Sequence, residues 1–222
     1  YEAMAATEAT LPNYTVYRPR DLAAAVSGEG ALPVMVFGNG GCSNSSLTHE
    51  RVLTEIASHG YMIIAIGALE MAPGTRQHAS TESSRLFDAM DWIEEQAANP
   101  ESEYHERLAV DRLAAGGQSC GGAQVLYVAS DPRVRTSIMF NSGIGDMTMA
   151  GASRESLEGL QSPIVYIVGG EPDVATANAR MDFERISGVP VALVEAKAAQ
   201  LEDAMGEALD QLRRYHRQGP EL

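Results

Sequence analysis

Gly117-Gln118-Ser119-Cys120-Gly121 is the stretch that decides the fold of this chain. It follows a short apolar run at residues 113–115 and precedes an apolar, helix-forming run at residues 123–129. This context predicts a strand, a sharp turn and a helix. A serine at the apex of such a turn stands out from the end of a sheet, and the flanking glycines let the turn close because they lack a Cβ. The following helix points the positive end of its dipole at the serine. We therefore predict that Ser119 is a nucleophile; a glycine-rich turn with an incidental serine is the alternative.

A second glycine-rich stretch, Gly38-Asn39-Gly40-Gly41-Cys42, follows an apolar run at residues 34–37. A continuous apolar run is typical of a strand buried on both faces. Backbone N–H groups exposed at the end of such a strand can stabilise the oxyanion that acyl transfer creates. The predicted donors lie at Gly41 and Cys42 and at Cys120, the residue after the nucleophile. A plain tight loop is the alternative, but the pairing with the turn at Ser119 favours the oxyanion interpretation.

Three stretches of the sequence, residues 37–42, 53–61 and 117–122, resemble the α/β-hydrolase superfamily. The likeness is greatest to esterase-like proteins whose nucleophile turn reads Gly-Gln-Ser-Cys-Gly-Gly, and Gly169-Gly170-Glu171-Pro172-Asp173 resembles their acid-bearing loop. The resemblance spans roughly residues 14–196. It implies the fold, a serine nucleophile, an aspartate acid and a two-donor oxyanion hole. It also implies a histidine on a glycine-rich loop after the last strand.

The composition indicates a single α/β domain over residues 1–222, with residues 1–12 loosely ordered. The chain has 222 residues, 45% of them hydrophobic, which is enough for a sizeable core. Its formal net charge of −14 would repel phosphate backbones, so we expect no nucleic-acid partner. We also expect no membrane span, because no apolar run is long enough.

The first residue, Tyr1, is not methionine, so we expect that a segment has been removed. A cleaved secretory signal is one explanation and trimming is another. We therefore expect a secreted or periplasmic protein, with a cytoplasmic location as the alternative.

The two cysteines, Cys42 and Cys120, both lie on the predicted oxyanion loops. The fold would bring them together although they are far apart in the sequence. A disulfide between them would pin the two halves of the oxyanion hole; two small buried apolar side chains are the alternative. No histidine or acid cluster with ligand spacing accompanies them, so we expect no metal.

Alternating strands and helices are predicted along the chain. The expected strands cover 14–17 (an edge strand), 31–37, 61–66, 113–115, 136–140, 163–168 and 189–194; the expected helices cover 46–58, 80–98, 123–129, 175–186 and 198–215. This alternation predicts a doubly wound, mostly parallel sheet with helices on both faces. Little room remains between 140 and 163, so we expect little or no lid and an open site.

The acid of a serine triad in this fold follows a late strand. Asp173 lies at such a position and is the predicted partner of a catalytic imidazole. Its alternative role is to cap the helix expected near residue 175. Asp146 and Glu171 are weaker candidates.

The catalytic base is the difficulty, since only His216 of the five histidines follows Asp173 in the sequence. His216 lies at the far end of the helix expected at 198–215, roughly 25 Å from its start at 1.5 Å per residue. His59 and His105 are expected to be solvated, whereas His49 and His78 could rim the pocket. There are two explanations. A loop that carries the histidine is missing near residues 196–200, where no turn residue separates the expected strand from the expected helix. Alternatively, the chain is complete and its catalysis is impaired.

We therefore expect a serine hydrolase that cleaves small-molecule or polymeric carboxylic esters through an acyl-enzyme on Ser119. The alternative is a catalytically impaired or non-catalytic binding protein that keeps the hydrolase pocket. No cofactor is implied, and the sequence does not indicate an oligomeric state.

Overall fold

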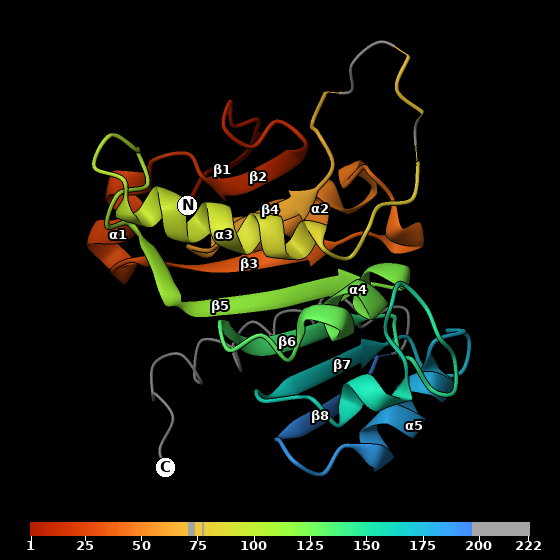
Figure 1. Ribbon diagram of the computed structural model, residues 1–222. Coiled ribbons are helices and arrows are strands. Elements are labelled where there is room, and N and C mark those ends of the chain that lie inside the picture. The colour runs from red at the N-terminus through yellow and green to blue at the C-terminus, as the bar shows by residue number, and fades with distance from the viewer. Residues whose placement is uncertain (71–73, 77, 197–222) are drawn as a thin grey trace.

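The computed structural model describes residues 1–70, 74–76 and 78–196. Its centre is an eight-stranded sheet with the order β1-β2-β4-β3-β5-β6-β7-β8 (Figure 1). The strands are β1 (Ala3–Ala6), β2 (Tyr14–Pro19), β3 (Leu32–Gly38), β4 (Met62–Ile66), β5 (Leu108–Gln118), β6 (Val134–Phe140), β7 (Ile164–Val168) and β8 (Val191–Glu195). β1 and β2 are antiparallel to their neighbours, and all other pairs are parallel. The predicted mostly parallel sheet is confirmed.

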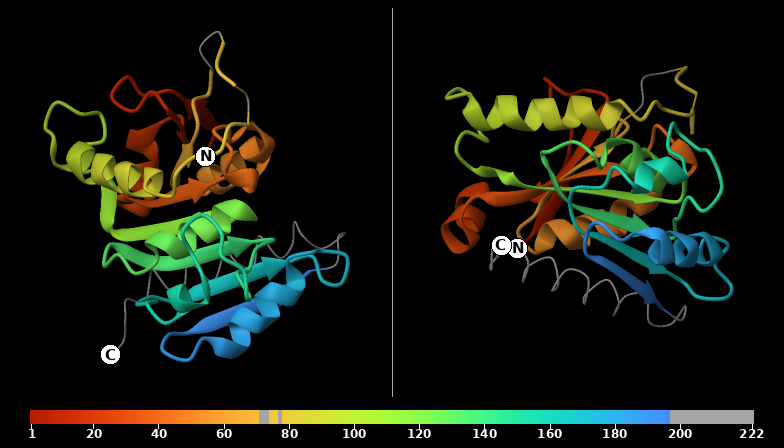
Figure 2. Two further views of the ribbon diagram at one scale, coloured as in Figure 1. Left: turned by 45° about the vertical axis from the view of Figure 1, so that its right-hand side comes forward. Right: turned by 60° about the horizontal axis from the view of Figure 1, so that its bottom comes forward.

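Helices cover both faces of this sheet. They are α1 (Leu22–Glu29), α2 (Glu50–Ser58), α3 (Arg85–Ala98), α4 (Cys120–Val128) and α5 (Thr176–Arg185), with short 3-10 turns η1 (Gly40–Cys42), η2 (Leu47–His49) and η3 (Arg154–Leu157). α2 packs on one face and α3 on the other (Figure 2). Leu53 and Ile56 of α2 and Leu86 and Met90 of α3 are buried. Each such side chain contributes about 1.5 to 3 kcal/mol through the removal of apolar surface from water. No helix in the described part of the chain is long and apolar enough to cross a membrane.

The two glycine-rich loops meet where the strand order reverses. The chain leaves β3 through α2 to reach β4 on one side, and later returns through α3 to β5 on the other. β3 and β5 lie side by side (Figure 1), and Gly38 is in register with Gly117. In an open parallel sheet, the crevice outside the carboxyl ends of the strands at such a reversal is where ligands bind. The topology therefore places both loops at one crevice.

The N-terminal segment differs from the expectation of a loosely ordered stretch. Ala3–Ala6 forms β1 and pairs with β2, and the Tyr1 ammonium donates a hydrogen bond to the Ser58 carbonyl at 2.7 Å. The prediction of a loose N-terminus is therefore wrong for these residues. It follows that β2 is not an edge strand, because β1 covers its outer side.

Two predicted helices begin later than expected. The 46–58 segment starts as the 3-10 turn η2 before α2 begins at Glu50. The 80–98 segment becomes helical only at Arg85, because Ser80 bridges to Ser43 and both the N–H and the hydroxyl of Thr81 donate to the Cys42 carbonyl. The helix expected at 198–215, His216 and residues 197–200, near which a loop was expected to be missing, lie outside the described residues.

Candidate active site

Ser119 stands at the strained apex of the turn between β5 and α4. Its backbone has φ 53° and ψ −120°, a left-handed conformation that costs a residue with a Cβ about 1 to 3 kcal/mol. The turn is held by neighbouring groups: the Ser119 N–H donates to the Phe140 carbonyl at 3.1 Å, and the Ser142 hydroxyl donates to the Ser119 carbonyl at 2.8 Å. These contacts hold the residue outward in a conformation that the chain would not otherwise adopt.

The glycines around Ser119 are required by close approach of the backbone. A Cβ on Gly117 would collide with the carbonyl oxygen of Gly121, and one on Gly121 would collide with the carbonyl oxygen of Gly38. The turn therefore closes on itself and packs directly against the end of β3. This is the local geometry that the sequence motif predicted.

The loop after β3 is fixed by an internal hydrogen-bond network. The Asn39 amide donates to the Ser43 carbonyl at 2.8 Å and to the Ile66 carbonyl at 2.6 Å. The Cys42 N–H donates to the Asn39 carbonyl at 3.0 Å, so this predicted oxyanion donor is engaged. The N–H groups of Gly41 and Cys120 have no acceptor among the described residues. Two of the three predicted donors are therefore free to bind an oxyanion.

A disulfide joins Cys42 to Cys120, with their Cα atoms 5.1 Å apart. It links the loop after β3 to the residue that follows Ser119, so the disulfide that the sequence left open is confirmed. The bridge ties together the two segments that carry the candidate oxyanion donors.

Removal of this disulfide should destabilise the protein strongly. The bridge spans a sequence separation of 78 residues, and the loss of loop-closure entropy from the unfolded chain then amounts to about 4 kcal/mol. We expect the Cys42→Ala/Cys120→Ala double variant to lose about that much free energy of unfolding in a urea titration. Reduced wild type should match the variant; a loss below about 1 kcal/mol would show that the bridge does not constrain the chain.

Asp173 lies on the loop after β7, and its carboxylate accepts three hydrogen bonds. Oδ2 accepts from the Asn141 amide at 2.7 Å and from the Gly169 N–H at 2.9 Å, while Oδ1 accepts from the Ala175 N–H at 2.9 Å. Desolvation raises the pKa of Asp173, but these three hydrogen bonds outweigh it and hold the pKa below its ordinary value. The carboxylate is therefore ionised at neutral pH. Oδ1 keeps a lone pair for one further donor.

The two weaker acid candidates are engaged elsewhere. Asp146 pairs with Arg185 at 2.7 Å, and Glu171 pairs with Arg180 at 3.1 Å, both on the surface. Among these three acids, only Asp173 is hydrogen-bonded to Asn141, which lines the pocket beside Ser119.

Ser119 opens into a cavity of about 520 Å³ at the carboxyl ends of β3, β5 and β6. Gly41 and Asn141 line it together with His49 and His78. Its apolar walls are Phe37, Val52 and Phe140. A pocket with apolar walls and a few polar groups around a strained serine suits an uncharged acyl group.

The four described histidines all have partners other than the Ser119 hydroxyl. His49 Nε2 accepts from the Gly40 N–H at 3.3 Å, and His78 Nδ1 lies 3.3 Å from the Ser43 hydroxyl. His59 pairs with a glutamate and His105 contacts a carbonyl, both away from the pocket. His49 and His78 thus rim the pocket as expected, and none of the four forms a hydrogen bond with Ser119 Oγ.

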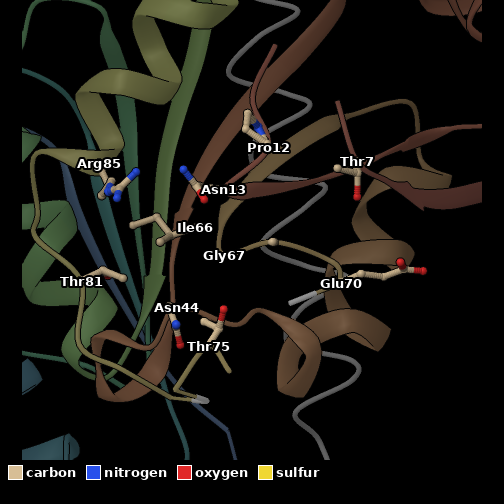
Figure 3. Close-up of a pocket in the computed structure, with 11 residues that line it drawn as sticks. Thr7, Pro12, Asn13, Asn44, Ile66, Gly67, Glu70, Thr75, Thr81 and Arg85 are labelled. Atoms are coloured by element: carbon tan, nitrogen blue, oxygen red, sulfur yellow. The ribbon is translucent and has the colours of Figure 1, made fainter. Parts of the chain in front are cut away.

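A second cavity of about 720 Å³ lies next to the first. Ser43 lines the first cavity, and its neighbour Asn44 lines the second. Figure 3 shows the side chains of Arg85 and Asn13 pointing toward each other across it. The described residues that line it include no serine or cysteine. Ser119, the candidate nucleophile, lines the smaller of these two cavities.

Two residues of the site were not singled out from the sequence. Asn141 and Ser142 follow β6 directly, and they bind Asp173 and the Ser119 carbonyl. The position of Asp173 in the loop after a strand identified it as a candidate. The same reasoning, applied to the polar pair that follows β6, could have identified Asn141 and Ser142. The described residues include no group of three or more histidine, cysteine, aspartate or glutamate side chains that could hold a metal ion.

Comparisons with known proteins bear on the family and the fold of the chain. A family model described as PET hydrolase-like (PETase) matches residues 13–183. Among solved structures, the chain is similar to dienelactone hydrolase from Anabaena variabilis, with a TM-score of 0.67 and 19% identity over 97% of this chain and 99% of that chain. It is also similar to a structure from an analysis of two fungal esterases from Rhizomucor miehei, with a TM-score of 0.65 and 15% identity over 92% of this chain and 80% of that chain. No curated protein sequence matches the chain.

At these identities the similarity to solved structures concerns the fold, and it confirms the α/β-hydrolase fold. The family model covers well over half of the 222 residues. The chain therefore belongs to the PET hydrolase-like family.

Proposed function

We propose that the chain is a serine hydrolase that cleaves carboxylic esters through an acyl-enzyme on Ser119. The observation that carries the proposal is the strained serine at a cavity that Gly41 also lines, with no acceptor among the described residues for the N–H groups of Gly41 and Cys120. A strained, outward-facing serine is costly to the fold, and such strain persists where function uses it. The PET hydrolase-like family and the esterase and dienelactone hydrolase folds support the same reaction class.

In the proposed reaction, Ser119 Oγ attacks the ester carbonyl carbon and the carbonyl oxygen becomes an oxyanion. The N–H groups of Gly41 and Cys120 stabilise this charge, and the N-terminus of α4 adds its dipole. The alcohol leaves, an ester to Ser119 remains, and water then releases the acid. The Ser119 proton must pass to a base, and we propose the histidine that the family resemblance implies on a loop after the last strand, oriented by Asp173.

The proposed substrates are bulky or polymeric esters. Because the chain belongs to a family described as PET hydrolase-like, poly(ethylene terephthalate) is the first polymer to test. Between β6 and β7 the only regular element is the four-residue turn η3, so the chain offers little to cover the cavity there. The net charge of −14 favours neutral over anionic substrates. The disulfide is compatible with an oxidising compartment, and we propose an exported protein.

Turnover of p-nitrophenyl butyrate tests the proposal directly. We expect steady release of p-nitrophenol, with a butyryl group on the peptide that contains Ser119 after rapid acid quenching and mass spectrometry. The rival is a binding protein that keeps the hydrolase pocket. It would bind the ester without release of p-nitrophenol and without an acylated peptide, and that result would overturn the proposal.

A further inference from the structure

His49 lies beside the oxyanion loop, and the reaction described above gives it no role. It ends the turn η2, directly before α2. Its Nε2 accepts a hydrogen bond from the Gly40 N–H at 3.3 Å. Its ring packs edge-on against Phe37 at the end of β3, with 5.4 Å between the ring centres. The side chain therefore contacts the loop and the strand that positions it.

The bond from Gly40 fixes one peptide unit of the oxyanion loop. The unit between Asn39 and Gly40 is held at both ends: its carbonyl accepts from the Cys42 N–H at 3.0 Å, and its N–H donates to His49. The next unit carries the free N–H of Gly41, and its carbonyl accepts from the Ser43 N–H at 3.2 Å. Backbone atoms supply all of these partners except one, which is the His49 ring.

Gly40 lies close to two side chains, those of Gln118 and His49. A Cβ on this residue would collide with Oε1 of Gln118, the residue before the nucleophile, and would lie 3.8 Å from His49 Nε2. The side chains of Gln118 and His49 thus both lie near the side of Gly40 on which a Cβ would stand. Glycine flexibility at positions 40 and 41 would otherwise let the free N–H turn away from the pocket.

We propose that His49 is a positioning residue, whose ring nitrogen Nε2 holds the Gly40 N–H so that the Gly41 N–H stays directed at the oxyanion. This role rests on the proposed function, because it concerns the same reaction. It requires a neutral ring with its proton on Nδ1, since Nε2 accepts. Burial lowers the pKa of His49, which keeps the ring neutral at pH 7.

Two variants separate the acceptor from the packing of the ring. His49→Phe keeps an aromatic ring against Phe37 but has no acceptor, whereas His49→Gln offers an amide oxygen. We expect His49→Phe to lower kcat for p-nitrophenyl butyrate by about 10- to 100-fold with KM changed less than about twofold, because a misplaced donor weakens transition-state binding. His49→Gln should recover kcat to within about threefold of wild type. His59→Gln, at the opposite end of α2 and away from the pocket, is the matched control and should leave kcat unchanged.

An amide measurement tests the contact without turnover. Hydrogen exchange of the Gly40 amide, followed by NMR, should be faster in His49→Phe than in wild type and slow again in His49→Gln. If His49→Phe misfolds, His49→Leu makes the same comparison.

The outcomes separate this role from the proposed function. No turnover by the wild type would overturn the proposed function, and the catalytic role of His49 with it. Normal turnover by wild type together with equal kcat in His49→Phe would overturn only the role of His49. A His49→Gln variant as slow as His49→Phe would likewise contradict the role of His49, because a hydrogen-bond acceptor at this position should be enough to restore kcat.

Discussion

Replacement of Ser119 with alanine should lower kcat/KM for p-nitrophenyl butyrate by at least about 10⁴-fold, because the acyl-enzyme cannot form without Oγ. The fold should remain intact. Alanine keeps the Cβ and the backbone strain, and the contacts that hold this turn run through the Ser119 N–H and carbonyl. The measurement is steady-state hydrolysis alongside the thermal unfolding midpoint of both proteins.

Ser130→Ala, at an exposed position after α4, is the matched control for loss of a serine hydroxyl. It should hydrolyse the ester at the wild-type rate. Unchanged hydrolysis by Ser119→Ala would remove Ser119 as the nucleophile.

Asp173→Asn should lower kcat by about 10³- to 10⁴-fold, because a neutral amide cannot stabilise an imidazolium or fix its tautomer. Asparagine keeps the size of the side chain and one of the two oxygens that accept from the loop N–H groups. Asp146→Asn and Glu171→Gln are the matched controls, because each removes an exposed carboxylate that pairs with an arginine among the described residues. Both should leave kcat within about twofold of wild type.

The alternative role of Asp173 makes a different prediction. If its carboxylate only caps the chain before α5, Asp173→Asn should cost about 1 kcal/mol of unfolding free energy and leave kcat unchanged. The pKa of Asp173 is held below its unfolded value of about 3.9, so its stabilisation is fully present above that pH. It is lost as the pH falls through the folded pKa. The catalytic role therefore predicts that any loss of activity near pH 6 comes from a group other than Asp173.

The central strands and the nucleophile turn were predictable because their signals are local. Residues 34–37 and 61–66 are continuous apolar runs, and they lie in β3 and β4. Ser119 follows β5 directly and Asp173 lies on the loop after β7, and ligands bind outside the carboxyl ends of the strands in an open α/β sheet. Prediction of the disulfide required the fold in addition to the local sequence, because Cys42 and Cys120 become neighbours only when β3 pairs with β5.

Other elements depend on contacts that no local pattern carries. Residues 3–6 are Ala-Met-Ala-Ala, without the alternation of a half-buried strand, and they become β1 by pairing with β2. α1 is alanine-rich with a weak apolar face, so it was not predicted, although Leu22 and Ala25 are buried. The contact between His49 and Gly40 likewise exists only because η2 folds back onto the loop.

Labelling with a fluorophosphonate tests the central claim most directly, because the reagent phosphonylates an activated serine and needs no knowledge of the substrate. We expect folded wild type to take up one phosphonyl group per chain, on the peptide that contains Ser119, and to lose ester hydrolysis in parallel. Ser119→Ala and urea-unfolded wild type should not react. Failure of folded wild type to react, or reaction at a different residue, would contradict the assignment of Ser119 as the nucleophile of an ester hydrolase.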